Sequence, residues 1–169
     1  MISEKLFYEL NKQMNFEFHS SHLYLAIAGY CASQDLDGFT NFFTVQAEEE
    51  KFHAMRFFNF INEMDGRLHL EGTGDLRNDF DSVLDAFKTA LAHEKGVTKR
   101  IYNLMDIATE EREHATISFL KWFIDEQVEE EATLSNIVKK LERISGDPHA
   151  LYTLDTELAA RVFVPPVVP

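Results

Sequence analysis

Apolar residues along this chain recur at alternating steps of three and four positions, the spacing that places them on one face of an α-helix. The pattern extends through four long segments and a shorter fifth. Their approximate limits are residues 4–33, 37–64, 83–109, 110–146 and 148–162. With only seven Gly and four Pro in 169 residues, the chain is poor in the turn residues that an all-β fold requires. The pattern therefore predicts an all-α fold.

The limits of these segments carry residues that are typical of helix ends. Ser3 is a suitable N-cap for the first segment, and Ser82 with Asp85 resembles a capping box at the start of the third. We place the start of the fourth segment at the acidic pair Glu110 and Glu111, because carboxylates are favourable near a helix N-terminus. The sequence thus predicts both the helices and their ends.

The connections between the segments predict how the helices are arranged. Short links join the first segment to the second and the third to the fourth, so we expect each pair to be antiparallel. The link over residues 65–82 is long and contains three Gly residues. A helix of about 28 residues is about 42 Å long, and roughly 16 extended residues span about 50 Å. This link can therefore cross the length of a four-helix bundle and leave the second and third helices parallel.

Length and composition indicate one domain, which we place in residues 1–163, followed by a Pro-rich tail over 164–169. We expect no membrane span and no signal peptide, because no apolar stretch approaches the roughly 20 residues of a span. A lone Cys31 excludes an intrachain disulfide and favours a reducing cytoplasm. The net charge of −13 argues against a nucleic-acid partner, because phosphate recognition needs a basic patch.

Polar residues interrupt the apolar faces of the four long helices, and they do so at one depth. Each helix carries one Glu close to its midpoint, so the four carboxylates are predicted to share the central layer of the bundle. One imidazole and one amide lie beside them in the pattern. The six residues are Glu17, Glu50, His53, Glu94, Gln127 and Glu130.

Four carboxylates in a dry core need compensation, because desolvating one charge costs on the order of several kcal/mol. Protonated Glu would make a poor core at neutral pH, and the apolar faces offer no Lys or Arg partner. Two divalent cations would neutralise all four charges. Glu50 and His53 are three positions apart and can face the same ion. Oxygen-rich ligands with few nitrogens suit iron or manganese better than structural zinc.

The residues around these positions resemble those of the bacterial non-haem ferritins over nearly the whole chain. The matching positions are residues 11–15, Glu17, Tyr24, 47–53, Glu94, 119–123 and 126–131. Their combined spacing is a far more specific signal than one Glu-x-x-His motif. The resemblance implies a ferritin-like four-helix bundle with one long crossover and a short fifth C-terminal helix. It also implies a cytoplasmic iron-storage protein with ferroxidase activity.

The resemblance implies a role for each central residue. Glu17, Glu50 and His53 would hold one iron ion, and Glu50 would bridge to a second. Glu94 and Glu130 would hold that second ion. Two metal ions in unequal environments are therefore expected.

Further roles follow from the same resemblance. Gln127 would lie close to the second iron or to bound oxygen, and Tyr24 is a candidate electron donor during oxidation. The family also has a third iron site. Its ligands would correspond to Glu49, Glu126, Glu129 and Glu130.

The partners implied are Fe(II), O₂ or H₂O₂, and further copies of the chain in a 24-subunit cage. Haem is not expected. Bacterioferritins carry Glu-x-x-His on both central helices and a haem-binding Met, whereas here the second motif runs from Gln127 to Glu130 as Gln-x-x-Glu, and Phe52 stands beside His53.

Two other functions remain open on the residues alone. A di-iron oxygenase or peroxidase acting on another substrate would need a similar centre with a substrate pocket beside it. A non-catalytic helical assembly protein could use the same carboxylates to bind a structural metal ion. Assembly size and oxygen consumption distinguish these from a ferroxidase.

Overall fold

The computed structural model describes residues 2–167, and all the regular secondary structure in that range is helical. Met1, together with Val168 and Pro169 of the predicted tail, lies outside the described residues. The helices are α1 (Glu4–Ser33), α2 (Asp37–Glu63), α3 (Val83–Glu110), α4 (His114–Ile144) and α5 (Pro148–Leu158). The predicted all-α class is confirmed. No helix of the described range is both long and apolar enough to cross a membrane.

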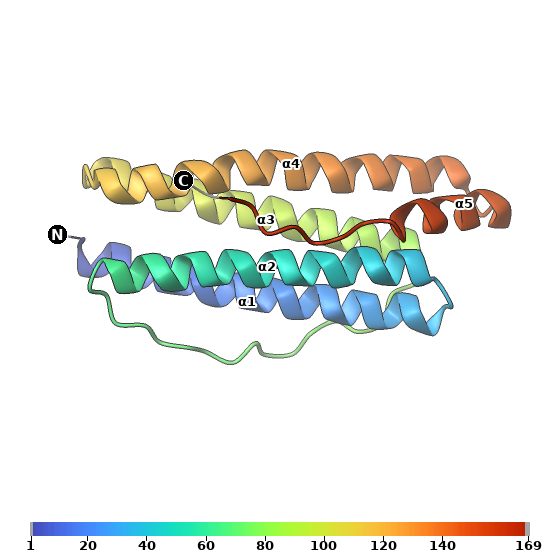
Figure 1. Ribbon diagram of the computed structural model, residues 1–169, viewed down its shortest axis with the longest axis horizontal. Helices are drawn as coiled ribbons and strands as arrows, with labels where there is room; N and C mark the ends of the chain where they lie inside the picture. The colour runs from blue at the N-terminus through green and yellow to red at the C-terminus, as the bar shows by residue number, and fades with distance from the viewer. Residues whose placement is uncertain (1, 168–169) are drawn as a thin grey trace.

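The four long helices form a bundle of two antiparallel hairpins (Figure 1). The first hairpin is α1 with α2, and the second is α3 with α4; contacts are most extensive within each hairpin. The segment between α2 and α3 crosses the full length of the bundle, so these two helices run parallel (Figure 1). The predicted topology, with one long crossover and a short C-terminal helix, is therefore confirmed.

Side chains of α1 hold the crossover segment in place. The Asn11 side chain pairs with the backbone of His69: its Nδ2 donates to the carbonyl at 3.1 Å, and its Oδ1 accepts from the amide at 2.8 Å. Farther along α1, His19 Nδ1 lies 2.9 Å from the carbonyl oxygen of Thr73. These contacts give hydrogen-bond partners to backbone groups that have none within a helix. The crossover consequently lies against the outside of α1.

The bundle interior consists of two apolar clusters with a polar layer between them. One cluster, rich in Phe, lies toward α5 and includes Phe39, Phe43 and Phe87. The other lies toward the opposite end and includes Leu10 and Phe57. The side chains of both clusters are buried, so each cluster covers one end of the layer between them. The polar layer is therefore enclosed along the bundle axis.

The start of the fourth helix differs from the prediction. The acidic pair at Glu110 and Glu111 ends α3, and α4 begins four residues after Glu110, at His114. Arg112 turns the chain with a φ of 54°. The Glu113 carboxylate then accepts from the backbone N–H of Thr116 at 2.8 Å, which makes it the N-cap. An acidic residue does begin the helix, but the turn shifts that role to the third Glu of the run.

The fifth helix is also shorter than predicted. It ends at Leu158 instead of near residue 162. Asn41 of α2 holds the chain at this point, because its side-chain Nδ2 donates to the carbonyls of Leu158 at 3.2 Å and Arg161 at 2.9 Å. The Leu158 carbonyl also accepts from the backbone N–H of Arg161 at 3.3 Å, a tight turn that ends the helix. The chain therefore leaves α5 and turns along α2.

Candidate metal centre

The predicted central residues meet in the polar layer, and none is more than 5% exposed. Each long helix contributes at least one side chain, because one position on its buried face falls at the middle of the bundle. The layer is formed by Glu17 of α1, Glu50 and His53 of α2, Glu94 of α3, and Gln127 and Glu130 of α4.

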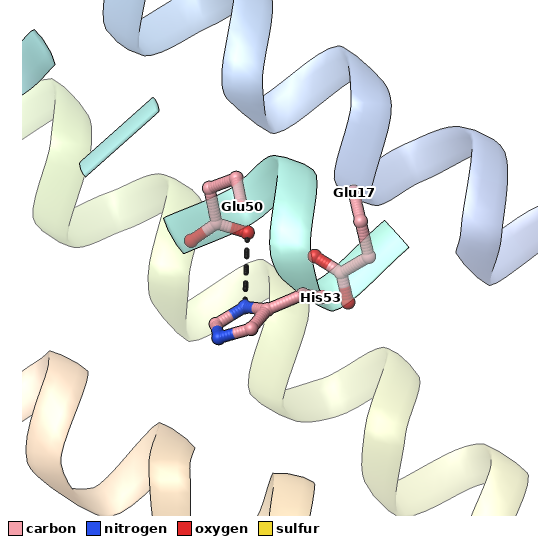
Figure 2. A group of neighbouring side chains, drawn as sticks. All are labelled: Glu17, Glu50 and His53. Atoms are coloured by element: carbon pink, nitrogen blue, oxygen red, sulfur yellow. Dashed lines mark ion pairs between the residues drawn. The ribbon is translucent and has the colours of Figure 1, made fainter. Parts of the chain in front are cut away.

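One group of metal-binding atoms comes from α1 and α2. Glu17, Glu50 and His53 each offer a donor atom, and these atoms lie within 4.8 Å of one another. Figure 2 shows the two carboxylates and the imidazole converging from neighbouring helices. His53 Nδ1 lies 3.4 Å from Glu50 Oε2. Three donors from two helices at this spacing can hold one cation.

A second group extends from His53 toward α4. His53, Glu126 and Glu130 also have donor atoms within 4.8 Å of one another. His53 Nε2 lies 4.0 Å from Glu126 Oε1, and Glu126 is only partly buried. His53 therefore stands between the buried centre and a carboxylate closer to the surface.

Hydrogen bonds orient the carboxylates of α3 and α4. The Tyr24 hydroxyl donates to Glu94 Oε1, and Gln127 Nε2 donates to Glu94 Oε2 at 3.0 Å. Gln46 Nε2 donates to Glu130 Oε2 at 2.6 Å. All these groups are buried, so each bond fixes the direction of a carboxylate in a dry environment.

The remaining two carboxylates have oxygens left without such support. Glu17 Oε1 accepts from Gln13 Nε2 at 2.7 Å, but Glu17 Oε2 and both oxygens of Glu50 have no hydrogen-bond partner among residues 2–167. An unpaired buried acceptor costs about 1–3 kcal/mol, and more if it is charged. Cations bound at this point would satisfy all three oxygens, so the donor set fits a metal centre.

Burial changes the protonation of these carboxylates in the metal-free protein. Desolvation raises the pKa of Glu17 and of Glu50 well above the ordinary value, and neighbouring carboxylates raise both further. Desolvation, with the charge of Glu94, raises the pKa of Glu130 to about 8. Burial also raises the pKa of Tyr24 well above its ordinary value, so its hydroxyl stays protonated and able to donate. Metal binding must displace protons from the layer.

Comparison with known proteins agrees with this geometry. The model of the ferritin-like domain family matches residues 8–144. Bacterial non-heme ferritins of Staphylococcus aureus (strain USA300) and Staphylococcus epidermidis are each 44% identical over 163 residues, which is 96% of this chain and 98% of theirs. The chain belongs to the bacterial non-haem ferritin family.

Solved ferritin structures share the whole fold. A novel open pore ferritin of the archaeon Archaeoglobus fulgidus superposes with a TM-score of 0.95 at 45% identity, covering 96% of this chain and 100% of that one. A humanized archaeal ferritin superposes with a TM-score of 0.97 at 45% identity, covering 98% and 100%. Membership of the ferritins supports iron storage, and it makes iron the metal expected at the centre.

Of the four predicted third-site residues, Glu130 is buried in the central layer, whereas Glu49, Glu126 and Glu129 are more accessible to solvent. Glu126 approaches His53, while Glu129 is exposed. Glu49 is partly buried and forms an ion pair at 2.5 Å with Arg161. The structure thus brings Glu126 to the centre and gives Glu49 a cationic partner from outside the bundle.

Sequence reasoning did not identify the residues that support the ligands. Gln13, which orients Glu17, is itself bound through its Oε1 by Arg100 Nε at 2.8 Å. The sequence signal for Gln13 was an amide four positions before Glu17, on the same face of the first helix, and the structure shows it to be 1% exposed. Arg161 carried no local signal, because its partner is 112 residues away in the chain.

Proposed function

We propose that this ferritin oxidises Fe(II) to Fe(III) with O₂ or H₂O₂ and stores the product as ferric oxide inside a 24-subunit cage in the cytoplasm. One observation carries the proposal. Three carboxylate oxygens of Glu17 and Glu50 are buried without hydrogen-bond partners among residues 2–167, in a layer that also holds Glu94 and Glu130. Two divalent ions compensate these four carboxylates, whereas one leaves an excess of negative charge.

The first iron ion is assigned to Glu17, Glu50 and His53, and the second to Glu94 and Glu130. Glu50 suits the role of bridge, because neither of its oxygens is engaged by a hydrogen bond within the described chain. The second ion has one nitrogen ligand fewer than the first. The two positions should therefore bind iron with unequal affinity.

Gln127 and Tyr24 are assigned to the second ion's surroundings. Both donate to Glu94, so they hold that ligand in position while the metal charge changes. Tyr24 is also the proposed electron donor, since its hydroxyl reaches a ligand directly. A third, weaker iron position is assigned to four carboxylates of α2 and α4. They are Glu49, Glu126, Glu129 and Glu130.

The protein's own contribution is positioning, charge neutralisation and exclusion of water. Glu17, Glu50 and Glu130 give up protons as the metal binds, and the amides of Gln13 and Gln46 keep two of them aligned. The redox chemistry belongs to the iron: two Fe(II) ions supply two electrons, which with two protons convert O₂ to H₂O₂ and leave two Fe(III).

Rapid-mixing absorbance with Fe(II) and O₂ tests the proposal. Glu17→Ala and His53→Ala should each slow the fast oxidation phase by about a hundredfold or more, because loss of a ligand disturbs the geometry of the reacting pair. Glu48→Ala is the matched control, since Glu48 is an exposed carboxylate on the same helix as His53. Unchanged kinetics in both ligand variants would refute the assignment.

Assembly separates storage from the other di-iron chemistries. Size-exclusion chromatography of the native protein should give a large particle that acquires an electron-dense core when iron and O₂ are added. A monomer or dimer that forms no mineral would instead favour an oxygenase or peroxidase acting on another substrate. A centre that binds metal without consuming O₂ would indicate a structural ion.

A further inference from the structure

The chain that follows α5 folds back along the bundle beside α2 (Figure 1). Three groups fix this segment, residues 159–167. Asn41 binds its first carbonyls, Arg161 makes an ion pair with α2, and the ring of Phe163 packs 6.2 Å from that of Phe52. These contacts follow α2 toward the level of His53, which immediately succeeds Phe52. The segment therefore covers the outside of the metal layer.

Within this segment, the side chain of Arg161 makes several polar contacts with α2. Its Nη2 donates to Glu49 Oε2 at 2.5 Å, and its Nη1 donates to Gln46 Oε1 at 2.8 Å. The guanidinium also lies over the ring of Phe42, 4.4 Å from the centroid. The side chains of Arg161 and Glu49 are 24% and 22% exposed. This ion pair is partly buried, and a second hydrogen bond and an aromatic contact also hold the guanidinium, so Glu49 already has a well-positioned cation beside it.

This arginine connects directly to the metal layer. Gln46, whose Oε1 accepts from Arg161, donates through Nε2 to Glu130 at 2.6 Å. The bond from Arg161 fixes which end of the Gln46 amide faces Glu130. Glu49, in turn, stands one position before Glu50 on α2. The guanidinium thus lies one side chain away from ligands of the proposed di-iron centre.

We propose that Arg161 is a built-in competitor for the third metal ion, holding Glu49 until an incoming cation displaces the guanidinium. The inference rests on the proposed function, since it concerns the carboxylates assigned to that third position. Arg stays charged at all physiological pH values and its fork matches a carboxylate. A third ion at Glu49 must break this pair, so it binds more weakly than the first two. Its arrival removes one of the three contacts that fix residues 159–167 against α2 and so loosens that segment.

Titration calorimetry with Zn²⁺ alone, on the assembled metal-free protein, tests the competition. Arg161→Ala should strengthen the third Zn²⁺ binding step by about tenfold relative to the first step, the scale of a partly buried charge-assisted hydrogen bond. Arg161→Lys should keep the third step weak because the cation is retained. The double variant Arg161→Ala, Glu49→Gln should lose the gain.

Lys140→Ala is the matched control, because Lys140 forms an ion pair of 2.8 Å with Glu157 on the outside of α4 and α5. It removes a cation near the same C-terminal element without touching the metal layer. A third step that is equally weak in Arg161→Ala and in the native protein would overturn the proposal. So would an equal gain in Lys140→Ala.

Hydrogen exchange of the native protein provides a test that needs no variant. Mass spectrometry of the C-terminal peptide should show faster exchange over residues 159–167 only when Zn²⁺ rises from two to three equivalents per subunit. Binding of the third ion with no change in exchange would contradict the displacement. Zn²⁺ takes no part in redox chemistry, so these results stand apart from any failure to oxidise iron.

Discussion

The buried carboxylates differ in how far the protein itself satisfies them. Glu94 accepts side-chain hydrogen bonds at both oxygens, Glu17 and Glu130 each accept one from a glutamine, and Glu50 accepts none from the described residues. A carboxylate that already has donors is held in one direction, whereas one without donors depends on a cation. The gradient makes Glu50 the residue whose environment changes most on metal binding.

Tyr24→Phe tests the hydrogen bond that holds Glu94, the carboxylate with the most donors. The hydroxyl is fully buried and donates to Glu94, so its removal leaves a buried acceptor unpaired. We expect a loss of about 1–3 kcal/mol in the metal-free protein, which corresponds to a fall in Tm of several degrees. Scanning calorimetry measures it, with Tyr152→Phe as the control because Tyr152 is 69% exposed. An equal Tm for both variants would show that the bond contributes nothing.

At the scale of elements, α5 packs against the start of α2, where it supplies a hydrogen-bond acceptor to an unpaired backbone N–H. The N-cap residue of α2, Leu36, offers no side-chain hydrogen bond. Asp155 of α5 supplies it instead, since its Oδ1 accepts from the backbone N–H of Phe39 at 2.9 Å. The carboxylate also suits the positive end of the α2 dipole. Gly38 allows this approach, because a Cβ there would lie 1.6 Å from the carbonyl oxygen of Asp155.

Gly38→Ala should therefore destabilise the protein although alanine favours helices. The added methyl meets backbone, which cannot move as a side chain would, and we expect a loss of about 1–3 kcal/mol. Gly96→Ala in α3 is the matched control, since nothing lies within 4 Å of the new Cβ. That variant should gain about 0.5–1 kcal/mol. Calorimetric Tm values that move in the same direction for both would contradict the docking argument.

For the whole molecule, the enclosed layer makes stability depend on protons and metal together. Burial raises the pKa of Glu17, Glu50 and Glu130, so the folded metal-free protein holds protons that the unfolded chain releases at lower pH. Between the ordinary pKa of 4.5 and the folded value of about 8 for Glu130, the native state binds more protons than the unfolded state. The contribution of these groups to the free energy of unfolding is therefore largest at low pH and falls as the pH rises.

Melting of the metal-free protein between pH 5 and 9 tests this dependence. The free energy of unfolding should decrease by about 1.4 kcal/mol per pH unit for each extra proton bound by the native state. Saturating Zn²⁺ should flatten or reverse the trend, because metal replaces the protons. Glu130→Gln should reduce the slope, since Gln does not titrate. A metal-free protein that is equally stable at pH 5 and pH 9 would contradict the burial argument.

Much of the fold and the core of the candidate site could be predicted from residue order. The spacing of apolar residues and the capping residues depend on neighbours a few positions apart, and these features predicted five helices. The lengths of the links predicted how the helices pair and where the crossover lies. The shared central layer of Glu17, Glu50, Glu94 and Glu130 could be predicted because each lies close to the midpoint of its helix. Local signals misplaced the start of α4, because Glu110, Glu111 and Glu113 are each suitable to begin it and only the turn at Arg112 selects Glu113.

The sequence by itself determined the helices and the level at which charged side chains enter the core, because both depend on spacing along one helix. Only the tertiary structure decided which residues complete that layer. Gln13 bound by Arg100, and Glu49 paired with Arg161 across 112 positions, join residues that no local period relates. Ion pairs and hydrogen bonds of this kind form where the folded chain brings atoms within about 3 Å, and that proximity exists only after the helices have packed.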